Sequence, residues 1–235
     1  MQHKKLQTTR HIIQGVFFAL LLAGLYMNLR MALIVFLPGA LFFGNFFCGW
    51  ICPFGALQEV CGMLGSKIVK KKFTMPWALQ KYLRFVRYGI FILFVAGIAS
   101  TILASINGYG TFFNTIAQGF ILSSSTVIMI SLLVIALFFE RPFCNYLCTE
   151  GVKYGILSFL RIFTIKRNPE TCVHCKKCDN ACPMHLVISD KTQIRNAQCI
   201  NCFQCISACP VETTLSYGFT KIQWKTREKQ VQKEK

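Results

Sequence analysis

Eight of the thirteen cysteines follow a spacing that is typical of iron–sulfur proteins. The pattern Cys-x2-Cys-x2-Cys-x3-Cys-Pro occurs twice in close succession. Its members are Cys172, Cys175, Cys178, Cys182 and Pro183 in the first copy, and Cys199, Cys202, Cys205, Cys209 and Pro210 in the second. Three closely spaced thiolates can hold three corners of one cubane, whereas zinc sites usually show paired knuckles with a longer gap. The double run therefore predicts two [4Fe–4S] clusters and one-electron chemistry.

In a two-cluster bacterial ferredoxin unit, the fourth cysteine of each run binds the cluster of the other run. The expected ligands are Cys172, Cys175, Cys178 and Cys209 for the first cluster, and Cys199, Cys202, Cys205 and Cys182 for the second. His174 and His185 lie in or beside these motifs, but both ligand sets are complete without them. We therefore interpret the two histidines as surface residues or as neighbours of the ligands.

A second cysteine pattern occurs twice at a constant offset of 96 residues. Cys48 and Cys52 lie in one copy and Cys144 and Cys148 in the other, within matching Phe-Cys-x-aromatic-aliphatic-Cys-x2-Gly segments. Residues four apart share one face of a helix, and a two-fold axis between repeats would bring the copies face to face. We expect one four-thiolate site here, an iron–sulfur cluster. The alternatives are zinc, a redox-active dithiol, and packing or palmitoylated thiols. Cys61 has no partner in the repeat and is interpreted as an inert core thiol.

The composition is too apolar for an ordinary soluble domain, with 54% hydrophobic and only 15% charged residues. Uncharged runs long enough for transmembrane helices cover residues 12–29, 31–58, 88–105 and 120–139. The second run is expected to bend near Pro53. The expected fold is an all-α membrane domain of four transmembrane helices, as a two plus two pseudo-repeat, over residues 1–165. A small α+β two-cluster ferredoxin domain follows over residues 166–218, and then a basic tail over residues 219–235.

The net charge of +17 follows the expected membrane topology. Lysines and arginines gather before the first run, between the second and third, and after the fourth, which predicts that both termini are cytoplasmic in a multi-pass protein of the inner membrane. Cysteines on that reducing side favour thiolate ligands over disulfides. Nucleic acid is not an expected partner, because the basic residues flank apolar segments. An interfacial helix is expected over residues 153–165, holding the ferredoxin domain at the membrane surface.

The segment from Phe47 to Leu57, the second Cys-x3-Cys motif and the C-terminal ferredoxin together resemble the NapH/NosR group of polyferredoxin-like membrane proteins. The likeness is closest to the NapH-type quinol dehydrogenase membrane subunit. It implies a membrane-bound iron–sulfur subunit that passes electrons between the quinone pool and other redox subunits of a larger complex, with quinone or quinol as substrate. Carried over by position, both Cys-x3-Cys pairs match the family's motif, but Thr149 stands where the first copy has Pro53.

Three functions are therefore compared. The chain is an electron-transfer subunit of a quinol-linked oxidoreductase, an assembly factor that reduces a metal or thiol for another complex, or a membrane anchor for a soluble oxidoreductase. Quinol oxidation requires proton acceptors, and Glu59, Glu140 and Glu150 are the acidic residues near the expected membrane surface.

Overall fold

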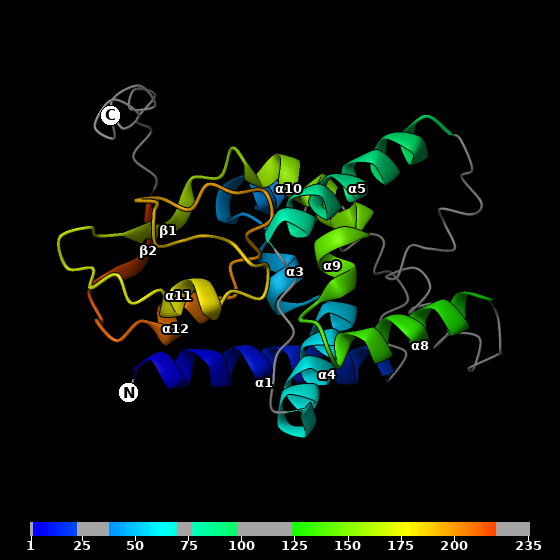
Figure 1. Cartoon of the computed structure of the whole chain (residues 1–235), viewed down its shortest axis with the longest axis horizontal. Helices are drawn as coiled ribbons and strands as arrows, with labels where there is room; N and C mark the ends of the chain where they lie inside the picture. Colours follow the sequence, from blue (N-terminus) through cyan, green and yellow to red (C-terminus); the bar gives the residue numbers. More distant parts are fainter. Residues whose placement is uncertain (1, 23–37, 70–76, 98–123, 220–235) are drawn as a thin grey trace.

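The computed structural model of the chain describes residues 2–22, 38–69, 77–97 and 124–219, which form two regions side by side (Figure 1). The ferredoxin region contains β1 (Phe163–Arg167), α11 (Lys177–Asn180), α12 (Gln204–Ala208) and β2 (Leu215–Phe219). The helical region contains α3 (Phe46–Trp50), α4 (Pro53–Val69), α5 (Trp77–Val95), α8 (Ser124–Ala136), α9 (Pro142–Tyr146) and α10 (Thr149–Ser158). α1 (Gln2–Leu22) links the regions, because it packs against α12 as well as α3 and α4.

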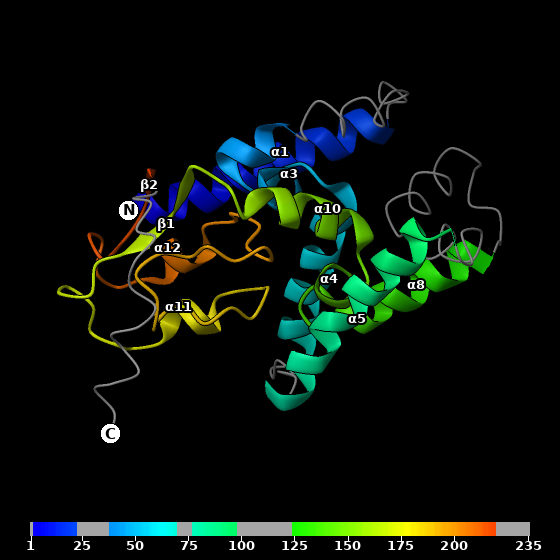
Figure 2. The ribbon, with the colours of Figure 1, turned by 90° about the horizontal axis from the view of Figure 1, so that it is seen from above.

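The ferredoxin region is closed by a two-stranded antiparallel sheet. β1 pairs with β2 from Phe163 opposite Phe219 to Arg167 opposite Leu215. β1 opens the region and β2 ends it, so their pairing folds the second cysteine run back beside the first. Figure 2, turned from the first view, also places this sheet far from α5 and α8.

The 96-residue repeat is visible in the local structure of the helical region. α3 begins at Phe46 and α9 at Pro142, and each is a five-residue helix that carries the first cysteine of its motif. α4 and α10 begin at the same offset, at Pro53 and Thr149. Each copy is thus a short helix, a turn at the second cysteine and a longer helix.

The expected membrane domain of four transmembrane helices is wrong. Within the described ranges, no helix combines the length and the apolar character needed to cross a membrane. α1 and α5 are long but carry charges, including Arg10 in α1 and Arg84 and Arg87 in α5. α8 is apolar, but its 13 residues extend only about 20 Å at 1.5 Å per residue, against roughly 30 Å of hydrocarbon.

Of the four uncharged runs, the second misled the prediction because turns divide it. The run over residues 31–58 is interrupted at residues 44–45 and again at residues 51–52, so its described part forms three helical segments: residues 38–43, α3 and the start of α4. Similarly, the expected interfacial helix over residues 153–165 ends early, since α10 stops at Ser158 and β1 begins at Phe163. Residues 23–29, 31–37, 98–105 and 120–123 of these runs, and residues 220–235 of the tail, lie outside the described residues.

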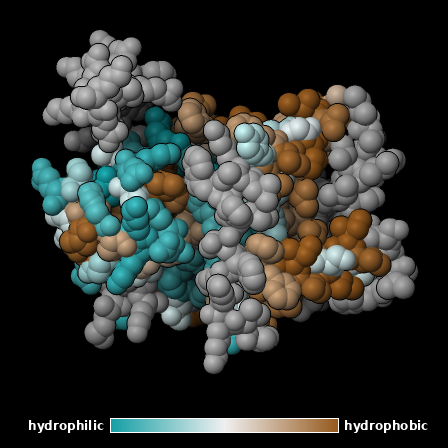
Figure 3. Space-filling model, in the orientation of Figure 1, coloured by the Kyte–Doolittle hydropathy of each residue, from teal (hydrophilic) through white to brown (hydrophobic). Residues whose placement is uncertain are grey.

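The two regions differ in surface character. Figure 3 shows hydrophilic side chains over much of the ferredoxin region and a broad hydrophobic surface at the opposite end, over α5 and α8. Exposed apolar side chains there include Ile92 and Val95 of α5 and Val127 and Val134 of α8. Large exposed apolar surfaces usually mark contact with another protein or with lipid.

Candidate iron–sulfur sites

The structure gathers the eight ferredoxin cysteines into two sets around two separate small cavities. The first ferredoxin set comprises Cys172, Cys175, Cys178 and Cys209. The second ferredoxin set comprises Cys182, Cys199, Cys202 and Cys205. Each set takes three cysteines from one run and the fourth from the other. The structure therefore brings together the same four cysteines that the sequence groups in each set, and their role as cluster ligands stays a prediction.

The backbone of the two cysteine loops has the same unusual conformation. His174 and Lys176 have positive φ angles of 53° and 54°, and the equivalent Asn201 and Phe203 have 50° and 58°. Residues other than glycine rarely adopt the left-handed backbone conformation. Where left-handed and right-handed conformations alternate, successive backbone N–H groups point toward one concave side. Such concavities bind anions, including iron–sulfur sites. The loops therefore fit a negatively charged cluster within four thiolates.

The two ferredoxin sets differ in their surroundings. All four cysteines of the second set are buried, whereas Cys175 of the first set is exposed and its three partners are only partly covered. Burial raises the pKa of Cys182, and the Cys202 thiol raises it further. In the first set, hydrogen bonds from the His174 backbone and from Arg167 lower the pKa of Cys172. The first set therefore faces solvent and the second faces the protein core.

The Cys-x3-Cys motifs form a third group of four thiols, the helical set. Its members are Cys48, Cys52, Cys144 and Cys148. Burial raises the pKa of Cys48 well above its usual value, and the other three thiols of the set raise it further. The two copies of the motif therefore meet, as their pseudo-symmetry predicts.

The helical set also has hydrogen-bond donors that suit thiolate ligands. The Gly151 N–H donates to the Cys148 sulfur at 3.3 Å, and the Gly55 N–H donates to Cys52 at the equivalent position. Gln58 Nε2 lies 3.5 Å from the Cys144 sulfur. Four thiols with such donors fit a metal–thiolate centre. Across the described ranges, no three His, Cys, Asp or Glu side chains are arranged to hold a single metal ion.

The helical set lies against the second ferredoxin set, a contact that the sequence analysis did not predict. A Cβ atom on Gly49, between the first two cysteines, would lie only 2.2 Å from the Ile200 carbonyl oxygen. Asn145, at the equivalent position of the other motif, donates from Nδ2 to the Pro183 carbonyl at 3.1 Å. The residue after the first cysteine of each motif therefore contacts a loop of the second set. In the sequence, the equivalent positions of Gly49 and Asn145 in the repeat were the feature that could have indicated this contact.

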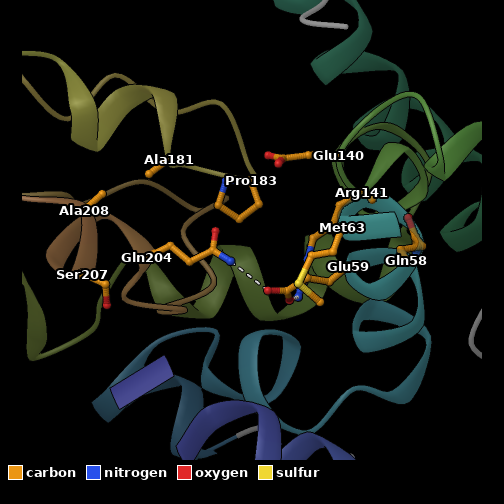
Figure 4. A pocket seen from close by; sticks show the side chains of 11 residues that line it. Gln58, Glu59, Met63, Glu140, Arg141, Ala181, Pro183, Gln204, Ser207 and Ala208 are labelled. Carbon is orange, nitrogen blue, oxygen red and sulfur yellow. Dashed lines mark hydrogen bonds and ion pairs between the residues drawn. The ribbon is translucent and has the colours of Figure 1, made fainter. Parts of the chain in front are cut away.

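The three glutamates predicted as proton acceptors lie in different places. Glu59 and Glu140 line a cavity of about 340 Å³ between α4 and the ferredoxin region (Figure 4). Burial tends to raise the pKa of Glu59, but Arg141 and Arg10 outweigh it and leave the pKa below its usual value. Glu150 pairs with Lys153 at 2.7 Å on α10. Glu59 is thus held as a buried carboxylate between two arginines.

Two family models match the chain and divide it as the structure does. The model described as "4Fe-4S binding domain" matches residues 25–72 and 124–166, once for each Cys-x3-Cys motif. The model described as "4Fe-4S dicluster domain" matches residues 164–210, which contain both ferredoxin runs. The two matches of the first model therefore follow the 96-residue repeat, and a 4Fe–4S family model matches residues of each region.

Several curated proteins are similar to the chain. YccM of Escherichia coli (strain K12) is 31% identical over 198 residues, 80% of this chain and 55% of YccM. The ferredoxin-type protein NapH of Haemophilus influenzae is 30% identical over 169 residues, 65% of this chain and 52% of NapH. The regulatory protein NosR of Pseudomonas aeruginosa is 34% identical over 148 residues, 61% of this chain and 21% of NosR. The chain thus spans about half of the first two relatives and a fifth of the third. No solved structure matches it.

Proposed function

The chain belongs to the NapH/NosR-type polyferredoxin-like family, and from this premise we propose that it passes electrons between the quinone pool and a redox partner at a membrane. Its 4Fe–4S domains make it an iron–sulfur electron-transfer protein. We propose in addition that quinone or quinol is its substrate, that it acts at a membrane, and that its partners are other redox subunits of a larger complex. The proposal also assigns each of the three cysteine sets a cluster.

The contiguity of the three sets carries this proposal. The helical set touches the second ferredoxin set at Gly49 and Asn145, and the second set shares both cysteine runs with the first. A [4Fe–4S] cluster supplies one-electron transfer when bound. The chain itself places the helical set against the second ferredoxin set, buries the second ferredoxin set and leaves the first ferredoxin set at the surface. That surface is the proposed contact with a redox partner.

An aromatic cavity is the proposed binding site for the quinol ring. The cavity has a volume of about 420 Å³, and its aromatic lining consists of Phe43, Phe46, Phe47, Trp50, Tyr154, Phe203 and Tyr217. Phe203 belongs to the loop of the second ferredoxin set, so a planar ring in the cavity would lie beside that set. Apolar pockets with a few polar groups are typical of small-molecule sites. None of the three glutamates lines this cavity. Its polar side-chain groups are the hydroxyls of Tyr154 and Tyr217 and the indole N–H of Trp50, which donates to the Asn201 carbonyl at 2.9 Å.

The apolar end of the molecule supports association with the cytoplasmic face of the inner membrane. The exposed apolar side chains of α5 and α8 form a broad hydrophobic surface (Figure 3). Burying apolar side chains at the lipid boundary drives such peripheral binding. Flotation with lipid vesicles tests this part, and Val127→Glu with Val134→Glu on α8 should reduce the bound fraction.

Iron content tests the three-set assignment. The intact chain should hold about twelve irons, and Cys52→Ser with Cys148→Ser should leave about eight, because each cubane contains four. EPR should show the loss of one centre and the retention of two. Unchanged iron and acid-labile sulfide in the double variant would remove the helical set from the proposal.

Quinone binding tests the aromatic cavity. Gly39 lines the cavity, and a Cβ added there would meet no atom within 4 Å, so Gly39→Leu should fill space without disturbing the fold. We expect it to weaken binding of a short-chain naphthoquinone at least tenfold in equilibrium dialysis. Gly89→Leu is the matched control, because Gly89 also has open space and lies outside the cavity. Equal affinity in both variants would contradict the assignment.

A further inference from the structure

A buried ion network joins α1, α4 and the start of α9. Arg10 and Arg141 each form an ion pair with a different oxygen of the Glu59 carboxylate. The exposed fractions of the three side chains are only 0%, 1% and 7%. Gln204 Nε2 donates a further hydrogen bond to Glu59 at 2.8 Å, which is visible in Figure 4. Glu59 is therefore the shared centre of the network.

Each arginine also reaches the backbone of a cysteine in one of the sets. Arg10 Nη1 donates to the Cys202 carbonyl at 3.0 Å. Arg141 Nη1 donates to the Cys48 carbonyl at 3.2 Å. The network therefore contacts the second ferredoxin set through Arg10 and the helical set through Arg141.

The charges of the network lie beside both sets, because the two guanidinium groups donate to the backbone carbonyls of Cys202 and Cys48, which are themselves expected ligands. Charges in an interior of low dielectric interact much more strongly than they do in water. The loss of hydration offsets much of the stability that a buried ion network could add to the fold. We therefore consider the electrostatic effect of the network on the neighbouring cysteine sets.

We propose that Glu59 is a positioning residue for electron transfer, which holds Arg10 and Arg141 against the second ferredoxin set and the helical set and offsets their positive charge there. This inference rests on the proposed assignment of clusters to those two sets. Nearby positive charge favours the more negative, reduced form of an iron–sulfur centre. Glu59 thereby moderates two neighbouring centres together and leaves the first ferredoxin set unaffected.

Redox titration of the full chain, monitored by EPR, tests the inference. Glu59→Gln keeps the size of the side chain and removes its charge, so the midpoint potentials of the helical and second ferredoxin centres should both rise. The potential of the first ferredoxin centre should stay unchanged. Glu150→Gln is the matched control, because Glu150 lies two residues after Cys148 of the helical set and pairs with Lys153 outside the network, so it should shift only the helical centre.

Arginine variants keep the inference testable if Glu59→Gln does not fold. Arg10→Met should lower the potential of the second ferredoxin centre, and Arg10→Lys should restore it by restoring the charge. Arg141→Met should lower the potentials of both centres. A merely structural role would not produce this pattern of signs.

The outcomes separate this inference from the function on which it rests. Three centres with unchanged potentials in Glu59→Gln and both Met variants would overturn the inference and leave the electron-transfer proposal intact. A uniform shift of all three centres would also overturn it. Absence of a centre from the helical set would defeat the three-set assignment, whereas a shift of the second ferredoxin centre alone would then still support the role of Glu59 there.

Discussion

The first and second ferredoxin sets have the same cysteine spacing and similar loop conformations, yet their environments are opposite. The first lies at the surface and is held by short-range contacts, including hydrogen bonds from the Ile188 and Ser189 N–H groups to Asp179. The second is buried and contacted by residues of the helical region. The comparison shows that one motif can serve as an outer and an inner site, depending on what packs against it. Four predictions test this difference.

The largest expected effect is on thiol alkylation after iron removal. Cys172 has a lowered pKa, whereas burial raises the pKa of Cys182. Because the thiolate is the reactive form and Cys182 is also shielded from solvent, Cys172 should react much faster than Cys182 at neutral pH. Mass spectrometry of peptides from briefly alkylated protein measures the ratio. Similar rates would mean that burial does not distinguish the two sets.

A smaller effect is expected when the contact at Gly49 is filled. In Gly49→Ala the new methyl group must displace the Ile200 carbonyl, which should lower the free energy of unfolding by about 1–3 kcal/mol. The EPR signal of the second ferredoxin centre should broaden or disappear, while that of the first remains. Gly15→Ala in α1, where a Cβ meets nothing within 4 Å, should leave the signal unchanged and should raise the stability by up to about 1 kcal/mol, because Ala favours a helix interior over Gly.

Asp179→Asn should affect the first ferredoxin set more than the second, whose cavity Ile188 also lines. The Asp179 carboxylate accepts the Ile188 and Ser189 N–H groups at 2.6 and 2.9 Å. Replacing one oxygen with an amide should cost about 1 kcal/mol of unfolding free energy and raise the potential of the first centre. Denaturant unfolding and redox titration provide the two measurements. A larger shift in the potential of the second centre than of the first would contradict this prediction.

The smallest effect concerns the pH dependence contributed by Glu59. Its folded-state pKa is lowered, so its stabilisation is present above the unfolded pKa of about 4.3 and is lost as pH falls through the folded value. Between about pH 5 and pH 3, the wild type should lose more stability than Glu59→Gln. Denaturant midpoints across this range measure the difference. If the denaturant midpoints of the wild type and of Glu59→Gln changed equally with pH, the two arginines would not stabilise the ionised form of Glu59.

Some features of the molecule could be predicted from local sequence patterns, whereas others depend on tertiary packing. The ferredoxin cysteines and the repeat at Cys48 and Cys144 were recognisable because thiol spacing is a local property. The transmembrane helices were predicted wrongly because an uncharged run does not reveal a turn such as the one at Cys52. Arg10 and Arg141 were interpreted as topology signals, since nothing in the sequence shows that they meet Glu59 in the interior.

By itself, the sequence determined the chemistry: twelve of the thirteen cysteines follow two repeated spacings that indicate iron–sulfur centres, because thiolate number and reach follow from residue order. The tertiary structure alone decided which ferredoxin set is buried and which contacts lie beside it. The approach of Gly49 to Ile200 and the joining of Arg10, Glu59 and Arg141 bring together segments far apart in the chain. Burial and electrostatics depend on such long-range packing, which spacing along the chain does not encode.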